Sequence, residues 1–412
     1  MTLAPAGSTW AGSHHYAARG LARPRSVEEL QELVTAEPRL RALGSRHSFT
    51  DLADTDGVLV GLDAMPRTVE LDTDARTVRV AAGMRYGDVA VDLHGQGWAL
   101  GNLASLPHIS VGGAVATGTH GSGIRNGSLA TAVAAIEFVD GRGELVRLAR
   151  GDEAFEGAVV ALGLLGVVTH LELDVEPAYD IRQTLYEGMT WDALLGDLDG
   201  VLGAAYSVSA FTRWREVEQV WVKSRDAVAD ELFGAHRAPA QRHMIAGMPT
   251  ENTTAQLGVP GPWHERLPHF RLGFMPSGGE ELQTEYFVAR ERGAEAIEAV
   301  RGLADRIEPL LLVSELRTIA ADDLWLSGAE GRDTLALHFT WVRDLERVPA
   351  LLPALEERLL PLGARAHWGK LFAAGPDVWR PRYRRWADFA ALRRRFDPER
   401  RFANAWAERV LG

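Results

Sequence analysis

Gly44-Ser45-Arg46-His47-Ser48 is the stretch that decides how this sequence is interpreted, and it follows the strand-like run Leu40–Leu43. A buried strand that ends in a glycine and small polar residues can turn several backbone N–H groups toward one point, where they bind a phosphate. The histidine behind the turn can serve as a hydrogen-bonding group, a nucleophile or a covalent anchor. By itself the stretch is also typical of a surface loop, so its meaning depends on two later stretches, around residues 105–123 and 315–370.

Length and composition limit the class of protein. A chain of 412 residues predicts two or three domains, and 46% apolar with 24% charged residues is typical of a globular protein in water. The formal net charge of −12 argues against nucleic acid or an anionic membrane surface as partner. The longest apolar run, 158–168, is shorter than the roughly 20 residues of a spanning helix. No signal segment is recognised, so we expect a cytoplasmic protein.

Two residue counts narrow the chemistry further. The chain has no cysteine, which excludes disulfides, thiolate metal sites, iron–sulfur clusters and a cysteine nucleophile. Among 44 basic residues only Lys223 and Lys370 are lysine, and arginine supplies the positive charge elsewhere. Each lysine is therefore a candidate for chemistry of its own, although chance survival explains a single lysine equally well.

The first 178 residues predict a mixed helix and strand domain. Ser26 and Glu29 form a capping box that opens a helix to about Ala36, and Pro38 ends it. Further strands are expected at 40–43, 58–62, 68–71, 77–81 and 166–175, a hairpin at 132–140 and 145–149, and helices at 86–95 and 155–164.

The segment 101–123, GNLASLPHISVGGAVATGTHGSG, is dense in small residues. Such a segment lets the backbone approach a ligand closely. A flexible linker is the alternative, but interleaved leucine, isoleucine and valine residues favour a folded segment.

From Pro177 to about Pro376 the sequence predicts a second α+β domain. Strands are expected at 206–214, 219–223, 284–288, 313–319, 335–342 and 366–372, and helices at 294–307 and 345–360, with a last helix at 383–395. Alternation along two of these strands places Glu315 with Arg317, and His338 with Thr340, on one face each. A buried ion pair or a polar edge is the simple interpretation of these pairs.

Taken together, the turn at 44–49, the segment 101–123, Val259–Phe270, His367-Trp368-Gly369-Lys370 and Phe402-Ala403-Asn404 resemble the vanillyl-alcohol-oxidase type of flavoprotein. Within it the resemblance is closest to the alditol oxidases, which oxidise xylitol and sorbitol. It implies an α+β fold of two domains: a VAO/PCMH-type FAD-binding domain at 1–178 that is completed by 376–412, and an α+β cap (substrate) domain at 179–375.

The resemblance also implies the cofactor site. The turn at 44–48 would hold the pyrophosphate of FAD, and His47 would be joined covalently to the flavin. Arg46 stands where many relatives have glycine, so we expect no conformation there that only glycine can adopt. The implied FAD-binding residues are Arg41, Gly44, Ser45, Arg46, His47, Ser48, Ser105, His108, Ser110, Gly113, Thr117, Gly118, Thr119, His120, Gly121, Ser122 and Val168.

The substrate site follows from the same resemblance. Lys370, supported by His338, would take or polarise the reacting hydroxyl, and Arg317 would hold that end of the substrate. The residues implied to bind neighbouring hydroxyls are Ser105, Glu315 and Thr340. The expected activity is the oxidation of a primary hydroxyl of an alditol to the aldose, with O2 reduced to H2O2 and no metal involved. The alternatives are an aldonolactone oxidase or dehydrogenase of the same superfamily and a flavin-binding protein without turnover.

Overall fold

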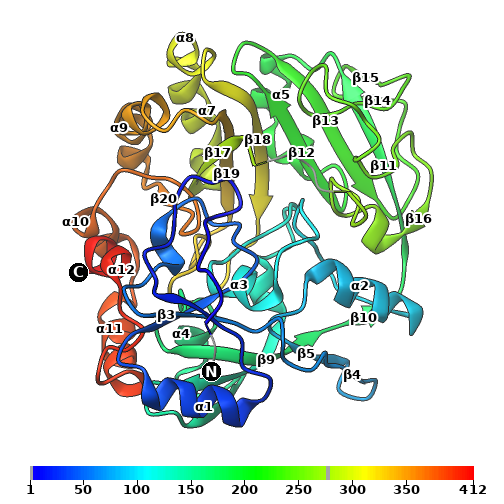
Figure 1. Ribbon diagram of the computed structural model, residues 1–412. Coiled ribbons are helices and arrows are strands. Elements are labelled where there is room, and N and C mark those ends of the chain that lie inside the picture. Colours follow the sequence, from blue (N-terminus) through cyan, green and yellow to red (C-terminus); the bar gives the residue numbers. More distant parts are fainter. Residues whose placement is uncertain (1–2, 275–278) are drawn as a thin grey trace.

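The computed structural model describes residues 3–274 and 279–412, and its first part contains the predicted strand and turn (Figure 1). β1 (Gly20–Ala22), β3 (Val58–Gly61) and β2 (Leu40–Leu43) form a parallel sheet in that order. α1 (Val27–Ala36) precedes β2, and the Ser26 side chain accepts a hydrogen bond from the Glu29 N–H, which confirms the predicted cap. β2 therefore delivers the turn at 44–48 from a buried strand.

A second, antiparallel sheet lies beside it. Its order is β4 (Val69–Asp72), β5 (Thr77–Ala81), β9 (Gly166–Asp174), β7 (Val133–Asp140) and β8 (Leu145–Ala149). β7 and β8 form the predicted hairpin. The other elements of this part are α2 (Tyr86–Gly95), α3 (Val111–Ala116), α4 (Phe155–Val159), and the pair β6 (Trp98–Ala99) and β10 (Glu176–Pro177). α3 lies inside the small-residue segment, which is folded as expected.

A ten-stranded sheet contains the strands between residues 180 and 366. Its order is β14 (Glu231–Leu232), β15 (Ala235–Arg237), β11 (Asp180–Glu187), β13 (Val217–Ser224), β12 (Ser207–Thr212), β18 (Leu311–Ile319), β19 (Thr334–Val342), β17 (Glu281–Ala289) and β20 (Arg365–Ala366), with β16 (Gly261–Pro262) beside β11. Its helices are α5 (Trp191–Gly196), α6 (Leu198–Leu202), α7 (Gly293–Arg301), α8 (Ala304–Ile307) and α9 (Arg347–Leu359).

The two faces of this sheet differ in chemistry. α7 and α9 contact β17, and Tyr286 of β17 donates a hydrogen bond to Glu356 of α9 at 2.9 Å. Leu316 and Leu337 alternate out of phase with the predicted polar residues and are fully buried in the core. The opposite face carries the polar residues toward the first part of the chain, below it in Figure 1.

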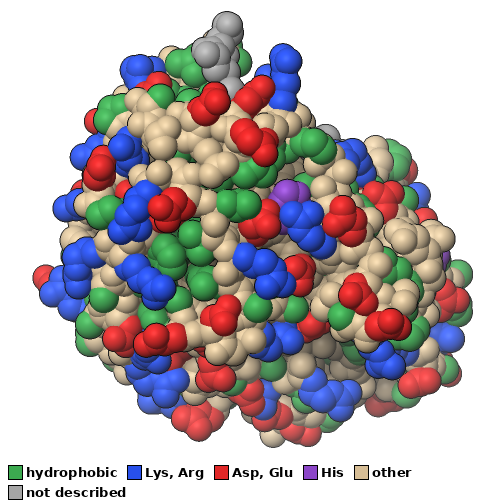
Figure 2. Space-filling view, turned by 90° about the horizontal axis from the view of Figure 1, so that it is seen from below, with side chains coloured by type: hydrophobic (Ala, Val, Ile, Leu, Met, Phe, Trp, Pro, Cys, Tyr) green, Lys and Arg blue, Asp and Glu red, His purple; other side chains and the backbone are tan. Residues whose placement is uncertain are grey.

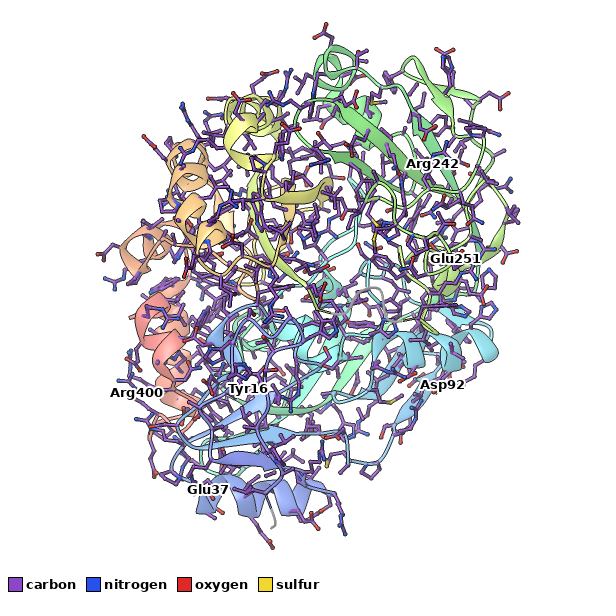
Figure 3. The ribbon with its side chains drawn as sticks, turned by 45° about the horizontal axis from the view of Figure 1, so that its top comes forward. Tyr16, Glu37, Asp92, Arg242, Glu251 and Arg400 are labelled. Carbon is purple, nitrogen blue, oxygen red and sulfur yellow. The ribbon has the colours of Figure 1, made fainter. Side chains whose placement is uncertain are left out.

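The C-terminal residues return to the first part of the chain. α10 (Pro376–Trp379), α11 (Trp386–Phe396) and α12 (Ala405–Leu411) follow the large sheet. Arg401 donates to the Glu37 carbonyl at 2.7 Å, and Figure 3 shows the neighbouring Arg400 at the same edge of the molecule as Glu37. This path agrees with the division predicted at residues 178 and 375, which we retain as a prediction.

Several predicted elements differ from the structure. The helix predicted at 155–164 ends at Val159, because Val160 leaves the helical region with φ −93° and ψ 77°, and Leu162 and Gly163 then adopt positive φ values of 57° and 67°. The strand predicted at 366–372 stops at Ala366, and the following residues form a turn beside β17. The helix predicted at 294–307 is broken near Gly302. The helix predicted at 383–395 corresponds to α11 and starts at Trp386, and α12 follows it. β11, α5 and α6 were not predicted.

Acidic and basic side chains are interspersed over the face shown in Figure 2. In the part of the chain that the structure describes, no helix combines the length and apolar character needed to cross a membrane.

Arg41 fixes the turn from behind. Its guanidinium is buried and donates to the carbonyls of Leu52, Leu162, Gly163 and Phe402 at 2.6–3.0 Å. These carbonyls come from segments far apart in the chain, so one planar side chain joins β2, the loop after α4 and the C-terminal return. The left-handed turn at Leu162 and Gly163, which follows α4, provides two of them.

We expect Arg41→Lys to destabilise the protein strongly. An ammonium cannot reproduce the planar arrangement of donors, and each buried carbonyl left unpaired costs about 1–3 kcal/mol. The melting temperature should fall by several degrees more than in Arg39→Lys, because Arg39 is exposed and donates to one carbonyl, that of Arg400. Equal melting temperatures in the two variants would show that Arg41 does not fix this region.

Candidate cofactor and substrate site

One cavity of about 630 Å³ lies between the turn at 44–48 and the polar face of the large sheet. Its wall includes residues of the first part of the chain, such as Gly44, His47 and Ser110, and residues of the sheet, such as Glu315 and His338. This volume is in the range of cofactor and substrate pockets. The two halves of the chain therefore share one site.

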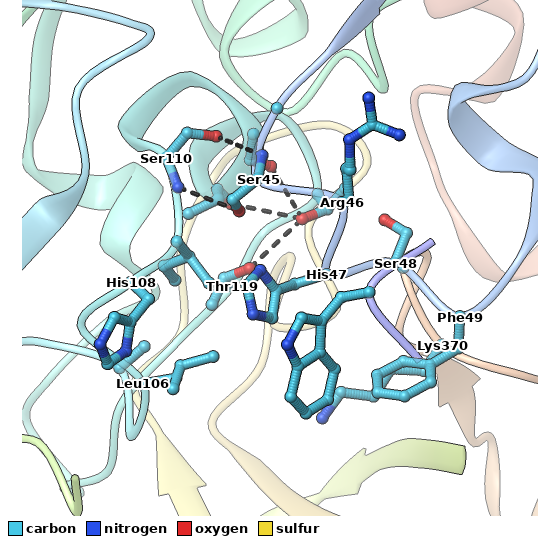
Figure 4. Close-up of a pocket in the computed structure, with 18 of the residues that line it drawn as sticks. Ser45, Arg46, His47, Ser48, Phe49, Leu106, His108, Ser110, Thr119 and Lys370 are labelled. Atoms are coloured by element: carbon cyan, nitrogen blue, oxygen red, sulfur yellow. Dashed lines mark hydrogen bonds between the residues drawn. The ribbon is translucent and has the colours of Figure 1, made fainter. Parts of the chain in front are cut away.

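The turn is held against the small-residue segment by two serines (Figure 4). The Ser110 N–H donates to the Ser45 hydroxyl at 3.2 Å, and the Ser45 N–H donates to the Ser110 hydroxyl at 3.3 Å. A Cβ on Gly44 would lie 2.5 Å from the Ser110 Oγ, so this contact requires glycine. The Phe49 N–H donates to the Gly369 carbonyl at 2.8 Å, which links the turn to the segment before Lys370.

Arg46 differs from the sequence-based expectation. Its φ is 65°, in the left-handed region that favours glycine and costs other residues roughly 1–2 kcal/mol. The Arg46 guanidinium donates to the carbonyls of Ala6 and Ser8 at 2.6 and 3.1 Å, and the Trp10 N–H donates to the Arg46 carbonyl at 2.8 Å. These contacts offset the backbone cost, so the turn uses the glycine-like conformation with an arginine.

The ring of His47 packs against the protein, whereas its two nitrogens have no partner among the described residues. Trp10 stacks on its ring with the centroids 5.1 Å apart. Both ring nitrogens are buried, and neither has a hydrogen-bond partner among the described residues. Burial lowers the pKa of His47 to about 4, so the imidazole is neutral at pH 7. The close Gly44 turn and the unpaired nitrogens of His47 fit an FAD held at this turn.

Most of the other predicted cofactor residues also line the cavity. Those that do are Arg41, Ser48, Ser105, His108, Gly113, Thr117, Thr119, His120 and Val168. Arg41 donates to backbone carbonyls, so we expect it to act on the cofactor indirectly. Gly118, Gly121 and Ser122 are outside the cavity wall. The Ser122 hydroxyl donates to the Val208 carbonyl, and a Cβ on Gly121 would lie 2.4 Å from the Leu103 carbonyl oxygen. These two residues pack the segment in place.

The predicted substrate residues lie together on the polar face of the sheet. Glu315 on β18 is paired with His338 on β19, and His338 is paired with Glu285 on β17. Thr340 lies one step along β19 on the same face. All of the predicted substrate residues line the cavity: Ser105, Glu315, Arg317, His338, Thr340 and Lys370. The structure thus brings this set together from two strands and two loops.

Glu285 is the residue at the centre that the sequence analysis missed. Its side chain is fully buried, with Lys370 Nζ at 2.7 Å, Arg317 Nη2 at 2.6 Å and His120 Nε2 at 3.3 Å. Burial alone would raise the pKa of Glu285, but Lys370, Arg317 and His120 together hold it well below its usual range. The sequence did carry a signal, because Glu285 is a charged residue inside the predicted apolar strand at 284–288.

Two opposing effects act on the pKa of Lys370. Burial lowers the pKa of Lys370 below its usual range, and the nearby Glu285 carboxylate acts in the opposite direction. The ammonium is therefore stabilised by one ion pair and destabilised by the loss of water. A lysine in this position can both hold a charge and exchange a proton nearer neutral pH than in water.

His338 is held in one tautomer by its neighbours. Gln283 donates through Nε2 to Glu281 at 2.7 Å, so its Oε1 faces His338 Nε2, at 3.1 Å. Nε2 of His338 therefore carries the hydrogen and Nδ1 is the acceptor nitrogen. Burial, reinforced by Lys370, lowers the pKa of His338 well below its usual range. The ring is neutral and can accept a proton or a hydrogen bond.

Glu315 is ionised, and a histidine holds one of its two carboxylate oxygens by a hydrogen bond. Its Oε1 lies 2.8 Å from His269 Nε2, and its Oε2 lies 3.6 Å from Arg317 Nε. Burial alone would raise the pKa of Glu315, but Arg317 and His269 outweigh this and lower it below its usual range. His269 was missed because it lies in a loop without periodicity. Arg317 also donates to the Ser105 hydroxyl at 3.4 Å, which joins the sheet to the small-residue segment.

Within residues 3–274 and 279–412, no group of three or more histidine, aspartate or glutamate side chains has the arrangement of a metal site.

Comparisons with known proteins agree on a flavoprotein. The family model described as "FAD binding domain" matches residues 18–149, and the model described as "D-arabinono-1,4-lactone oxidase" matches residues 280–410. The chain is 48% identical to an alditol oxidase from a Streptomyces species, over 99% of this chain and 100% of that protein. It is 30% identical to an L-gulono-1,4-lactone dehydrogenase from Mycobacterium tuberculosis, over 100% of both chains. The fold matches the crystal structure of cholesterol oxidase from B. sterolicum with a TM-score of 0.81 at 15% identity, over 100% of this chain and 97% of that one.

The buried neutral histidines predict a loss of stability in acid. Burial, reinforced by Lys223, lowers the pKa of His269 to about 4, whereas an unfolded histidine titrates near 6.5. Between these values the unfolded state binds more protons, so the free energy of unfolding falls as the pH decreases from about 6.5 toward 4.

The melting temperature, measured at several pH values across this window, should therefore drop, and His269→Gln should reduce the slope. The exposed His236 provides a matched control. His236→Gln should keep the slope of the parent, and an unchanged slope in His269→Gln would contradict the assignment.

Proposed function

This chain belongs to the family of FAD-dependent oxidoreductases that includes alditol oxidase and L-gulono-1,4-lactone dehydrogenase, and we propose that it oxidises alditols such as xylitol and sorbitol. The reaction converts a terminal CH2OH group to an aldehyde. The two electrons and two protons that leave the alcohol pass to O2, which becomes H2O2.

One observation carries this proposal. Charged, hydroxyl-bearing and imidazole side chains from two strands of the large sheet and from two loops line the cavity, namely Ser105, Glu315, Arg317, His338, Thr340 and Lys370. An open-chain polyol has a hydroxyl on every carbon and can pair with each of these groups. A substrate that lacks the hydroxyls would leave buried polar groups unpaired, which a site of this kind rejects strongly.

We assign the reacting hydroxyl to Lys370 and His338. When bound, FAD supplies the acceptor for the hydride that leaves the carbinol carbon. Lys370, held by Glu285, polarises the hydroxyl, exchanges a proton with it and stabilises negative charge on its oxygen. A neutral His338 with Nδ1 as its acceptor nitrogen supports the removal of the proton. Arg317 stabilises the same end of the substrate.

The remaining residues orient the substrate. Glu315 is a carboxylate with Oε2 available on the side of Arg317, and it can accept from two hydroxyls. Thr340 and Ser105 offer hydroxyl groups from the sheet and from the small-residue segment. Groups fixed on strands keep the reacting carbon in one position, which is where much of the rate enhancement of such a site would arise.

A second candidate substrate is an aldonolactone. The match of residues 280–410 to the model described as "D-arabinono-1,4-lactone oxidase" favours it. The 48% identity to an alditol oxidase over the whole chain, against 30% to the lactone dehydrogenase, favours the polyol.

The test of the proposed function is oxygen uptake with peroxide detection, using xylitol, sorbitol, glycerol and a galactonolactone at equal concentrations. We expect xylitol and sorbitol to consume O2 and yield equimolar H2O2, with much slower turnover of the lactone. Turnover of the lactone alone would overturn the alditol assignment, and a flavin-loaded protein without any turnover would overturn the enzymatic one.

We further propose that His47 holds the flavin covalently. The unpaired ring nitrogens and the lowered pKa leave a neutral imidazole with a free lone pair at the turn. Flavin fluorescence should travel with the protein band on a denaturing gel after acid treatment. His47→Ala should abolish that fluorescence, and His15→Ala, an exposed control, should retain it. A parent band without fluorescence contradicts the covalent bond.

Lys370→Arg should slow reduction of the flavin by excess xylitol under anaerobic conditions by about 10²–10⁴, the usual effect of a positioned proton-transfer group. Arginine can still pair with Glu285 but cannot exchange a proton near neutral pH. The visible spectrum shows whether the flavin content is intact. Lys370→Met, which lacks the charge as well, should be at least as slow. If the arginine variant is reduced within threefold of the parent while the methionine variant is not, Lys370 is a fixed charge only.

A further inference from the structure

A line of three buried side chains lies behind the substrate wall. Lys223 Nζ on β13 is 3.0 Å from His269 Nδ1, and His269 Nε2 is 2.8 Å from Glu315 Oε1. Lys223 also donates to the Leu267 carbonyl. The three residues are 2–4% exposed, and Lys223 is not part of the cavity wall. Among the described residues, Lys223 is thus connected to the substrate wall by hydrogen bonds through His269.

We propose that Lys223 and His269 are positioning residues that orient the Glu315 carboxylate for substrate binding and so set the affinity for polyols. This inference rests on the proposed function only in its choice of substrate. It assigns no contact between Lys223 and the substrate.

The chemistry of the three side chains decides which atom donates and which accepts in each hydrogen bond. An ammonium has only donors, so Nδ1 of His269 accepts from Lys223. The remaining hydrogen of the neutral imidazole is then on Nε2, which donates to Glu315 Oε1. One carboxylate oxygen is thereby occupied, and Oε2 is left toward Arg317 and the cavity. Without Lys223 the imidazole could place its hydrogen on Nδ1 and turn a lone pair toward the carboxylate, which repels it.

The surroundings of His269 keep the ring in one orientation. The ring of Phe211 lies edge-on with a centroid distance of 5.6 Å, and the ring of Trp221 with a distance of 5.1 Å. The backbone N–H of His269 donates to the Ser105 carbonyl at 2.9 Å, which fixes the main chain at this point. Because the ring is held in this way, the hydrogen bond from Lys223 also fixes the hydrogen bond that His269 donates to Glu315.

Burying a lysine at position 223 costs free energy, so its presence there indicates a role beyond packing. Burial lowers the pKa of Lys223 to about 7, with Glu315 acting against this shift and Arg317 acting with it. An apolar side chain of similar length would fill the same space without desolvating a charge. The charged and titratable groups around Lys223 are His269, Glu315 and Arg317, all of which belong to the site or support it.

A double-mutant cycle separates positioning from simple packing. Lys223→Met should raise the KM for xylitol about tenfold, a change equivalent to about 1.4 kcal/mol, and should alter kcat much less. His269→Leu should behave similarly. His269→Gln can accept through Oε1 and donate through Nε2, so it should restore most of the affinity.

In a Glu315→Ala background, Lys223→Met should change KM by less than twofold, because the group that it positions is absent. The same rise in KM in both backgrounds, or no rise in the parent background, overturns the proposal. The melting temperature and the visible flavin spectrum identify variants that have lost the fold.

A spectroscopic measurement tests the line without any turnover, so its result is independent of the proposed function. In the ¹⁵N-histidine spectrum of the flavin-loaded protein, the His269 signals, identified by their loss in His269→Gln, should show the Nε2–H tautomer. Lys223→Met should shift them toward the other tautomer. A His269 with its hydrogen on Nδ1 in the parent, or an unchanged spectrum in Lys223→Met, overturns the proposal.

Discussion

The polar site depends on compensating one fully buried carboxylate, that of Glu285. Such a charge is tolerated only when cations and hydrogen-bond donors replace the lost water. Here Lys370 and Arg317 are within 2.7 Å, and His120 is nearby. These partners come from a loop after the sheet, from β18, which is separated from the strand of Glu285 by β19, and from the small-residue segment. Compensating Glu285 therefore brings both halves of the chain to one point and fixes the groups that face the substrate.

The large sheet arranges the residues around Glu285 as a binding surface. Because side chains alternate along a strand, the face opposite α7 and α9 presents a row of paired residues, Glu315, His338 and Glu285, on adjacent strands. Two glutamates and the cations between them balance in charge, which leaves the site able to stabilise additional negative charge on an oxygen. Lys223 adds a further positive charge behind this row.

Sequence patterns predicted what depends on local chemistry. The turn after Leu43, the cap at Ser26 and the alternation in β18 and β19 could all be recognised, and the polar residues of those strands do line one cavity. Tertiary contacts decided the rest. The chain leaves the helical conformation at Val160 and then turns so that the carbonyls of Leu162 and Gly163 accept from Arg41. Arg46 adopts a positive φ because its side chain and carbonyl contact residues near the N-terminus. His269 lies in the stretch 259–270 that carried part of the resemblance, but its role was not predicted, since that role arises from a contact with Glu315, 46 residues away.

Anaerobic flavin reduction in Glu285→Gln is the measurement that tests this account most directly. The amide removes the charge that holds Lys370 and Arg317, while the size of the side chain is kept. At matched flavin content, the account predicts that excess xylitol reduces this variant roughly 100-fold or more slowly than the parent, the range of effect expected for a misplaced proton-transfer group. A Glu285→Gln protein reduced within threefold of the parent rate would contradict the claim that this buried carboxylate organises the site.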